Sequence, residues 1–172
     1  MKEAVPMTVT HADLLALWSE THVRLLDREA VDGLGLPDDA VRVLVDVGLP
    51  VHVGHYGFEP VPPRLFTPAS GTGTWCQIGR DEGGDFSLDL ATEALWSCVD
   101  TPELPTRFVN TTVSAFVELL CSAVRGRRDH AGDVSANYDA LHTAVSKVDP
   151  RALDDDENYW SVILEQMEIG LF

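Results

Sequence analysis

Residues 74–99 read TWCQIGRDEGGDFSLDLATEALWSCV, and this stretch decides the fold because it holds three short apolar runs separated by turn residues. The runs at 75–78 and 95–99 carry apolar residues on both sides of the strand alternation, which is typical of strands covered on both faces. At 86–90 apolar and polar residues alternate, which predicts a half-buried strand. The intervening turn residues predict hairpins at 80–85 and 91–93. The stretch therefore predicts three antiparallel strands in succession.

A long amphipathic helix is expected directly after these strands, in the segment RFVNTTVSAFVELL at 107–120. We expect Asn110 to cap this helix, since asparagine is a favoured residue at that position. The predicted apolar face consists of Val113, Phe116, Val117, Leu120, Cys121 and Val124. Arginines at 125, 127 and 128 follow near the C-terminal end, where cations stabilise the helix dipole. Their position explains them without a nucleic-acid site.

Two more helices are expected in the last third of the chain. The first carries an apolar stripe and ends before Pro150. Its stripe consists of Val134, Tyr138, Leu141, Val145 and Val148. The second follows the acidic run at 154–157, which favours a helix start. Its expected buried residues are Tyr159, Trp160, Ile163, Leu164 and Met167.

The N-terminal part is expected to be less regular. Thr10 followed by Asp13 forms a variant of the capping box, which predicts a first helix. Asp38 is expected to cap a second helix that ends at Gly48. The segment 51–66 is rich in proline and predicts an extended loop with at most an edge strand.

The composition indicates a single globular domain over residues 1–172, with 45% hydrophobic and 23% charged residues. The net charge of −16 argues against binding to nucleic acid and favours a basic partner. An acidic surface that only keeps the protein soluble is an equal alternative. We expect no membrane association and a cytoplasmic location, because the sequence contains neither a long apolar run nor a secretory signal.

Cysteine and histidine spacings provide no metal or cofactor site. Three cysteines at 76, 98 and 121 lie in separate apolar runs and are expected to be small buried residues. His52 and His55 form the only close histidine pair, and no third ligand lies near them in the sequence. The acids of the 80–85 loop lack the ligand spacing of a calcium loop, so a solvated turn is favoured. We therefore expect no metal and no cofactor.

The familiar catalytic motifs are missing, including the nucleophile elbow, the phosphate-binding loop and the zinc-protease helix. Acid/base chemistry by a pair of carboxylates has no sequence support beyond the presence of acids. The sequence therefore favours a binding protein over an enzyme.

Four segments in a fixed order resemble a known family. They are VDVGLP at 45–50, IGRDEGGDFSLDL at 78–90, FVNTTVSAF at 108–116 and WSVILEQMEIGLF at 160–172. Together they resemble the SUKH superfamily, in particular its SUKH-4 branch of actinobacterial immunity proteins. The resemblance runs from about residue 36 to the C-terminus.

This resemblance implies an α+β fold with a mainly antiparallel central sheet of about five or six strands surrounded by helices. It also implies a cytosolic immunity protein, monomeric or weakly dimeric, that neutralises a cognate toxin domain by occlusion. Such toxins are commonly nucleases or deaminases and are often basic. Aromatic residues anchor interfaces and carboxylates steer basic partners. The expected contact residues are Tyr56, Phe58, Arg80, Asp81, Glu82 and Asp85.

Two alternatives remain open at this point. The first is an intracellular scaffold or regulatory module of the same fold that binds a host protein. The second is a hydrolase or nucleotide-processing enzyme that uses the acids near 81–89.

Overall fold

A five-stranded antiparallel sheet forms the centre of the computed structural model, which describes residues 9–51, 58–69, 72–81, 83–98 and 106–171. The strand order is β3-β4-β5-β6-β7, so each strand pairs with its neighbour in the sequence. The strands are β3 (Glu59–Phe66), β4 (Trp75–Arg80), β5 (Asp85–Asp89), β6 (Leu95–Cys98) and β7 (Arg107–Asn110). A separate antiparallel pair joins β1 (Val23–Arg24) to β2 (Leu49–Pro50). The predicted α+β class and the antiparallel sheet are therefore confirmed.

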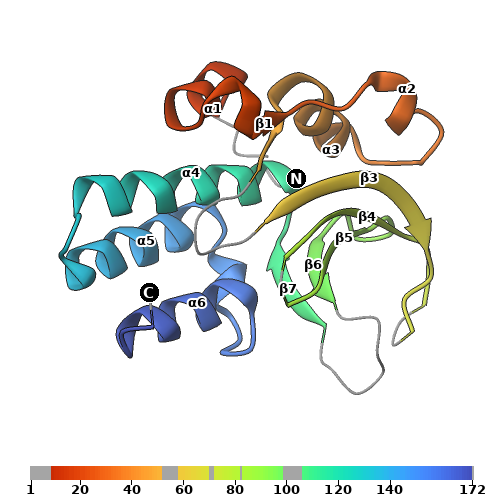
Figure 1. Ribbon diagram of the computed structural model, residues 1–172. Helices are drawn as coiled ribbons and strands as arrows, with labels where there is room; N and C mark the ends of the chain where they lie inside the picture. The colour runs from red at the N-terminus through yellow and green to blue at the C-terminus, as the bar shows by residue number, and fades with distance from the viewer. Residues whose placement is uncertain (1–8, 52–57, 70–71, 82, 99–105, 172) are drawn as a thin grey trace.

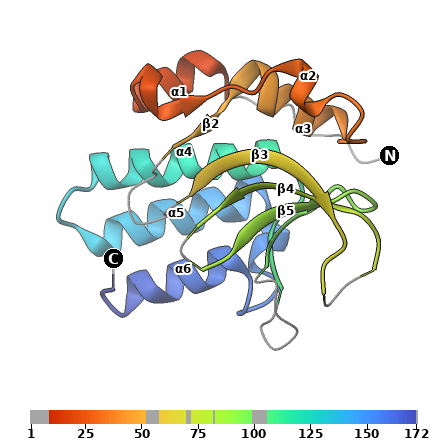
Figure 2. The same ribbon diagram turned by 45° about the vertical axis from the view of Figure 1, so that its right-hand side comes forward.

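The helices form two groups. In the N-terminal group are α1 (His11–Leu17), η1 (Glu20–His22), α2 (Arg28–Val31), α3 (Asp38–Arg42) and the π-helical turn η2 (Val43–Val47). The C-terminal group contains α4 (Val113–Asp129), α5 (Val134–Val148), η4 (Pro150–Leu153) and α6 (Tyr159–Glu168). Figure 1 shows α4, α5 and α6 beside the curved sheet, with α1 to α3 above them. The turned view in Figure 2 shows the same layers.

An aromatic cluster joins one face of the sheet to the helices. Phe58, just before β3, packs edge-on against Phe86 of β5 and Phe116 of α4, with ring centroids 5.2 Å apart in both pairs. Phe86 also contacts Tyr159 of α6 at 5.3 Å. Because all three phenylalanines are fully buried, this cluster is the centre of the core.

The long helix begins later than expected. Asn110 does not cap α4, because it ends β7 and is fully buried. Thr112 is the N-cap instead, and its hydroxyl accepts a hydrogen bond from the Ala115 N–H at 3.1 Å. The expected apolar face of α4 is otherwise confirmed, although Val124 is only half-buried.

Two strands of the sheet differ from their predicted burial, β5 being more covered and β6 less covered than expected. Ser87 is fully buried, so β5 is not a half-buried strand. In β6 the middle residues Trp96 and Ser97 are half-buried rather than covered.

On α5, Val134 begins the helix and remains 46% exposed, so it lies outside the buried stripe. All five buried residues expected in α6 are confirmed.

The N-terminal predictions are partly confirmed. Thr10 and Asp13 form the capping box of α1, in which the Thr10 N–H donates to Asp13 Oδ2 at 2.8 Å. Those hydrogen bonds lower the pKa of Asp13. Asp38 is not a cap, because Pro37 occupies the N-cap position of α3. The proline-rich segment ends in the edge strand β3, as expected.

Candidate partner-binding site

The β4–β5 hairpin carries most of the expected contact residues. Arg80 and Asp85 face each other across the hairpin. Arg80 reaches back to β3, where its Nε and Nη2 donate to Glu59 Oε2 at 3.2 and 3.1 Å. This ion pair is largely exposed and contributes little stability, but it fixes the direction of the guanidinium.

Asp81 shapes the hairpin turn. Its Oδ1 accepts hydrogen bonds from the backbone N–H groups of Gly83 and Gly84 at 2.7 and 2.8 Å. The Asp81 N–H in turn donates to the Gly84 carbonyl at 2.8 Å. A carboxylate that closes a turn in this way fixes the backbone of the loop. A partner would therefore contact the residues beside Asp81 more directly than its carboxylate.

The two aromatic residues expected as anchors have different outcomes. Phe58 is fully buried in the aromatic core, so the expectation that it lies on the surface is wrong. The reason is its long-range packing: a Cβ atom on Gly79 of β4 would lie 2.5 Å from Phe58 Cζ, so the bare glycine backbone makes room for the ring. Tyr56 lies outside the described residues, as do Glu82 and the histidine pair at 52 and 55.

A groove of about 440 Å³ opens beside the hairpin, between β1, β3, β4 and β5. Arg80 and Asp85 line it, so the structure brings two expected residues into one concave surface. It adds Arg24 and Arg64, which sequence reasoning missed because they lie on strands far apart in the chain. We call the surface formed by Arg24, Glu59, Arg64, Gln77, Arg80 and Asp85 the arginine groove.

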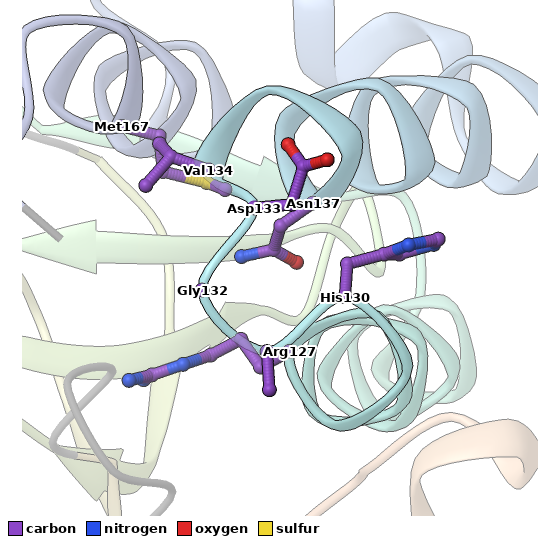
Figure 3. Close-up of a pocket in the computed structure, with 8 residues that line it drawn as sticks. Arg127, His130, Gly132, Asp133, Val134, Asn137 and Met167 are labelled. Atoms are coloured by element: carbon purple, nitrogen blue, oxygen red, sulfur yellow. The ribbon is translucent and has the colours of Figure 1, made fainter.

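A second pocket of about 350 Å³ lies at the turn between α4 and α5 (Figure 3). Arg127, His130 and Asn137 line it, with Met167 of α6 at one side. The side chains of Arg127 and His130 point in opposite directions in Figure 3. Because these two side chains do not converge, they do not form a single polar site in this pocket.

Thiol and metal chemistry find no support in the part of the chain that the structure describes. The cysteines at 76, 98 and 121 are buried and free of disulfides, as expected. Burial raises the pKa of Cys76 to about 11 and that of Cys121 to about 12, so both thiols stay protonated at neutral pH. No group of three or more histidine, cysteine, aspartate or glutamate residues suited to a metal ion occurs among these residues. None of the helices described there is long and apolar enough to cross a membrane.

These features define an α+β protein whose described residues present a charged groove beside an antiparallel sheet. The model of the SUKH-4 immunity protein family matches residues 9–166. The chain therefore belongs to the SUKH-4 immunity protein family, and the match begins well before the resemblance seen in the sequence. No curated protein and no solved structure matches the chain.

Proposed function

We propose that this protein is an immunity protein that acts in the cytoplasm, where it binds a cognate toxin domain and neutralises it by occlusion. Membership of the immunity protein family over residues 9–166 is the observation that carries the proposal. The missing catalytic motifs are compatible with a protein that acts by binding alone.

The charge of the chain supports a basic toxin, of the kind found among nucleases and deaminases. With 28 acidic and 12 basic residues, the protein attracts a basic partner over several ångströms and accelerates the encounter. The acids at 154–157 are all exposed and add to this field. We expect the association rate to fall as the salt concentration rises, while the dissociation rate changes little.

The contact surface that we propose centres on the β4–β5 hairpin. Arg80 is exposed and Asp85 is half-buried at the rim of the arginine groove. Tyr56, Asp81 and Glu82 remain proposed contacts, and Phe58 is removed because a partner cannot reach it in the core.

Co-expression with the toxin domains encoded beside the gene tests this function. We expect at least one of these domains to arrest growth alone, to lose that effect with the protein present, and to co-purify with it. Arg80→Gln should weaken binding, whereas Arg125→Gln, the same change at an exposed residue of α4, serves as the matched control. Binding without protection would point to the scaffold alternative. If the protein neither bound any of these toxin domains nor protected against them, the immunity function would be refuted.

A further inference from the structure

The arginine groove reverses the charge balance of the rest of the chain. Arg24, Arg64 and Arg80 all line it, although the chain has 28 acidic and only 12 basic residues. Glu59 and Asp85 are the acids in the lining. Glu59 is already paired with Arg80. The groove is therefore a cationic site on a strongly acidic protein.

Two of these guanidinium groups are held in place by neutral partners. Arg24 Nη1 donates to the Pro60 carbonyl at 3.2 Å, and Arg64 Nη2 donates to Gln77 Oε1 at 3.3 Å. The Arg64 guanidinium also lies over the Phe66 ring, 5.8 Å from its centroid. Among the described residues, neither arginine forms an ion pair. Both cations are thus oriented before binding and keep their full charge.

The same face of the sheet carries buried donors without acceptors. Neither Trp75 Nε1 nor Trp96 Nε1 has a hydrogen-bond partner among the described residues, and Trp75 is only 8% exposed. Their ring centroids lie 6.1 Å apart. The strand register places in one row Arg64, Gln77, Ser87 and Trp96. An indole can only donate, so these two N–H groups add unpaired donors to a face that already carries cations.

We propose that the arginine groove binds a carboxylate, supplied by an acidic side chain of the protein partner. Arg64 offers a fork of N–H donors that matches the two oxygens of a carboxylate, and Arg24 provides the second positive charge. Asp85 repels a carboxylate, so the ligand is held by Arg24 and Arg64 rather than beside Asp85. This inference deepens the proposed function: the acidic surface attracts a basic toxin, and the groove fixes its orientation through one acidic residue.

A titration of the full chain with N-acetylglutamate amide tests the groove without the toxin. The neutral N-acetylglutamine amide is the matched probe, and the readout is the NMR shift of arginine Nε–H and tryptophan indole N–H groups. We expect the Arg64 resonance to respond to the glutamate probe and not to the glutamine probe. An equal response to both probes, or none to either, would overturn the proposal.

Variants locate the binding within the groove. Arg64→Gln should lower the affinity for the glutamate probe about tenfold, since it removes a charge-assisted bidentate contact. Arg64→Lys retains the charge but not the fork, so it should also weaken binding, and Asp85→Asn should strengthen it. Arg125→Gln, on the last part of α4 outside the groove, is the control for net charge. Unchanged affinity in both Arg64 variants would refute the assignment.

The two proposals fail in different ways. If the glutamate probe binds but no toxin encoded beside the gene is neutralised, the proposed immunity function is wrong, whereas the proposed carboxylate site is retained. If a toxin is neutralised equally well by the parent protein and by Arg64→Gln, the proposed carboxylate site is wrong, whereas the proposed immunity function is retained.

Discussion

Trp160 donates a hydrogen bond from its indole Nε1 to Oδ1 of Asn110 at 2.9 Å, which joins α6 to the end of β7 inside the core. The Nδ2 atom of the Asn110 side chain donates to Asp149 Oδ2 at 3.0 Å, and the Thr111 backbone N–H donates to the same oxygen at 2.6 Å. One asparagine therefore satisfies polar groups from two later parts of the chain, 39 and 50 residues away from it.

Replacing Asn110 by alanine is expected to destabilise the protein strongly. Both Asn110 and Trp160 are fully buried, and Asp149 is 3% exposed. The substitution leaves the indole N–H without an acceptor and removes one donor from the carboxylate. A buried polar group without a partner costs about 1–3 kcal/mol, and more when it is charged. Urea denaturation measures the change, and Asn137→Ala on α5, which is half-buried, is the control. A loss no larger than that of the control would contradict the network.

Phe58→Ala distinguishes a core residue from an interface anchor. Its ring is fully buried against Phe86 and Phe116, so we expect a loss of about 3–5 kcal/mol in the free energy of unfolding. Arg80→Ala, at an exposed ion pair on the hairpin, should change stability by about 1 kcal/mol or less. Chemical denaturation of both variants checks the contrast. Equal stability of Phe58→Ala and the parent protein would place the ring outside the core.

Gly79→Ala tests how closely β4 approaches the same ring. The added Cβ would lie 2.5 Å from Phe58 Cζ and 3.2 Å from the Glu59 carbonyl oxygen. Because the Phe58 ring is enclosed by other aromatic residues, it cannot move away freely, and overpacking should cost about 1–3 kcal/mol. In Gly83→Ala the nearest atom is the Asp81 carboxylate at 3.3 Å, the end of a side chain that can adjust. Thermal unfolding should therefore show a much larger shift for Gly79→Ala than for Gly83→Ala.

The elements defined by local patterns were predicted from the sequence, and those defined by long-range packing were not. The capping box at Thr10, the two central hairpins and the buried face of α6 follow from spacing within a few residues. Asn110 was misassigned because its preference for a cap is local, whereas β7 extends to it through pairing with Leu95 of β6. Phe58 was misplaced for the same reason, since its burial depends on Gly79.

The candidate site was only partly predictable. Arg80 and Asp85 were expected on the hairpin, and the structure places both at the groove. Arg24 and Arg64 carry no local motif, and only the pairing of β3 with β4 and the position of β1 bring them to the same surface. Charge composition predicts an acidic surface overall, but it could not predict a cationic groove within it.

The buried thiols predict a loss of stability at high pH. Burial raises the pKa of Cys121 from 9.0 to about 12, so above pH 9 the unfolded chain releases this proton while the folded chain retains it. The contribution of Cys121 to stability is therefore fully present below pH 9 and is lost as the pH rises toward 12, by about 1.4 kcal/mol per pH unit at most. Urea denaturation from pH 8 upward measures the unfolding free energy of the parent protein and of Cys121→Ala. The difference between the two should become smaller with the same slope, because only the parent protein loses the contribution of this thiol. A difference that stays constant across this range would show that the thiol ionises equally in the folded and unfolded chains.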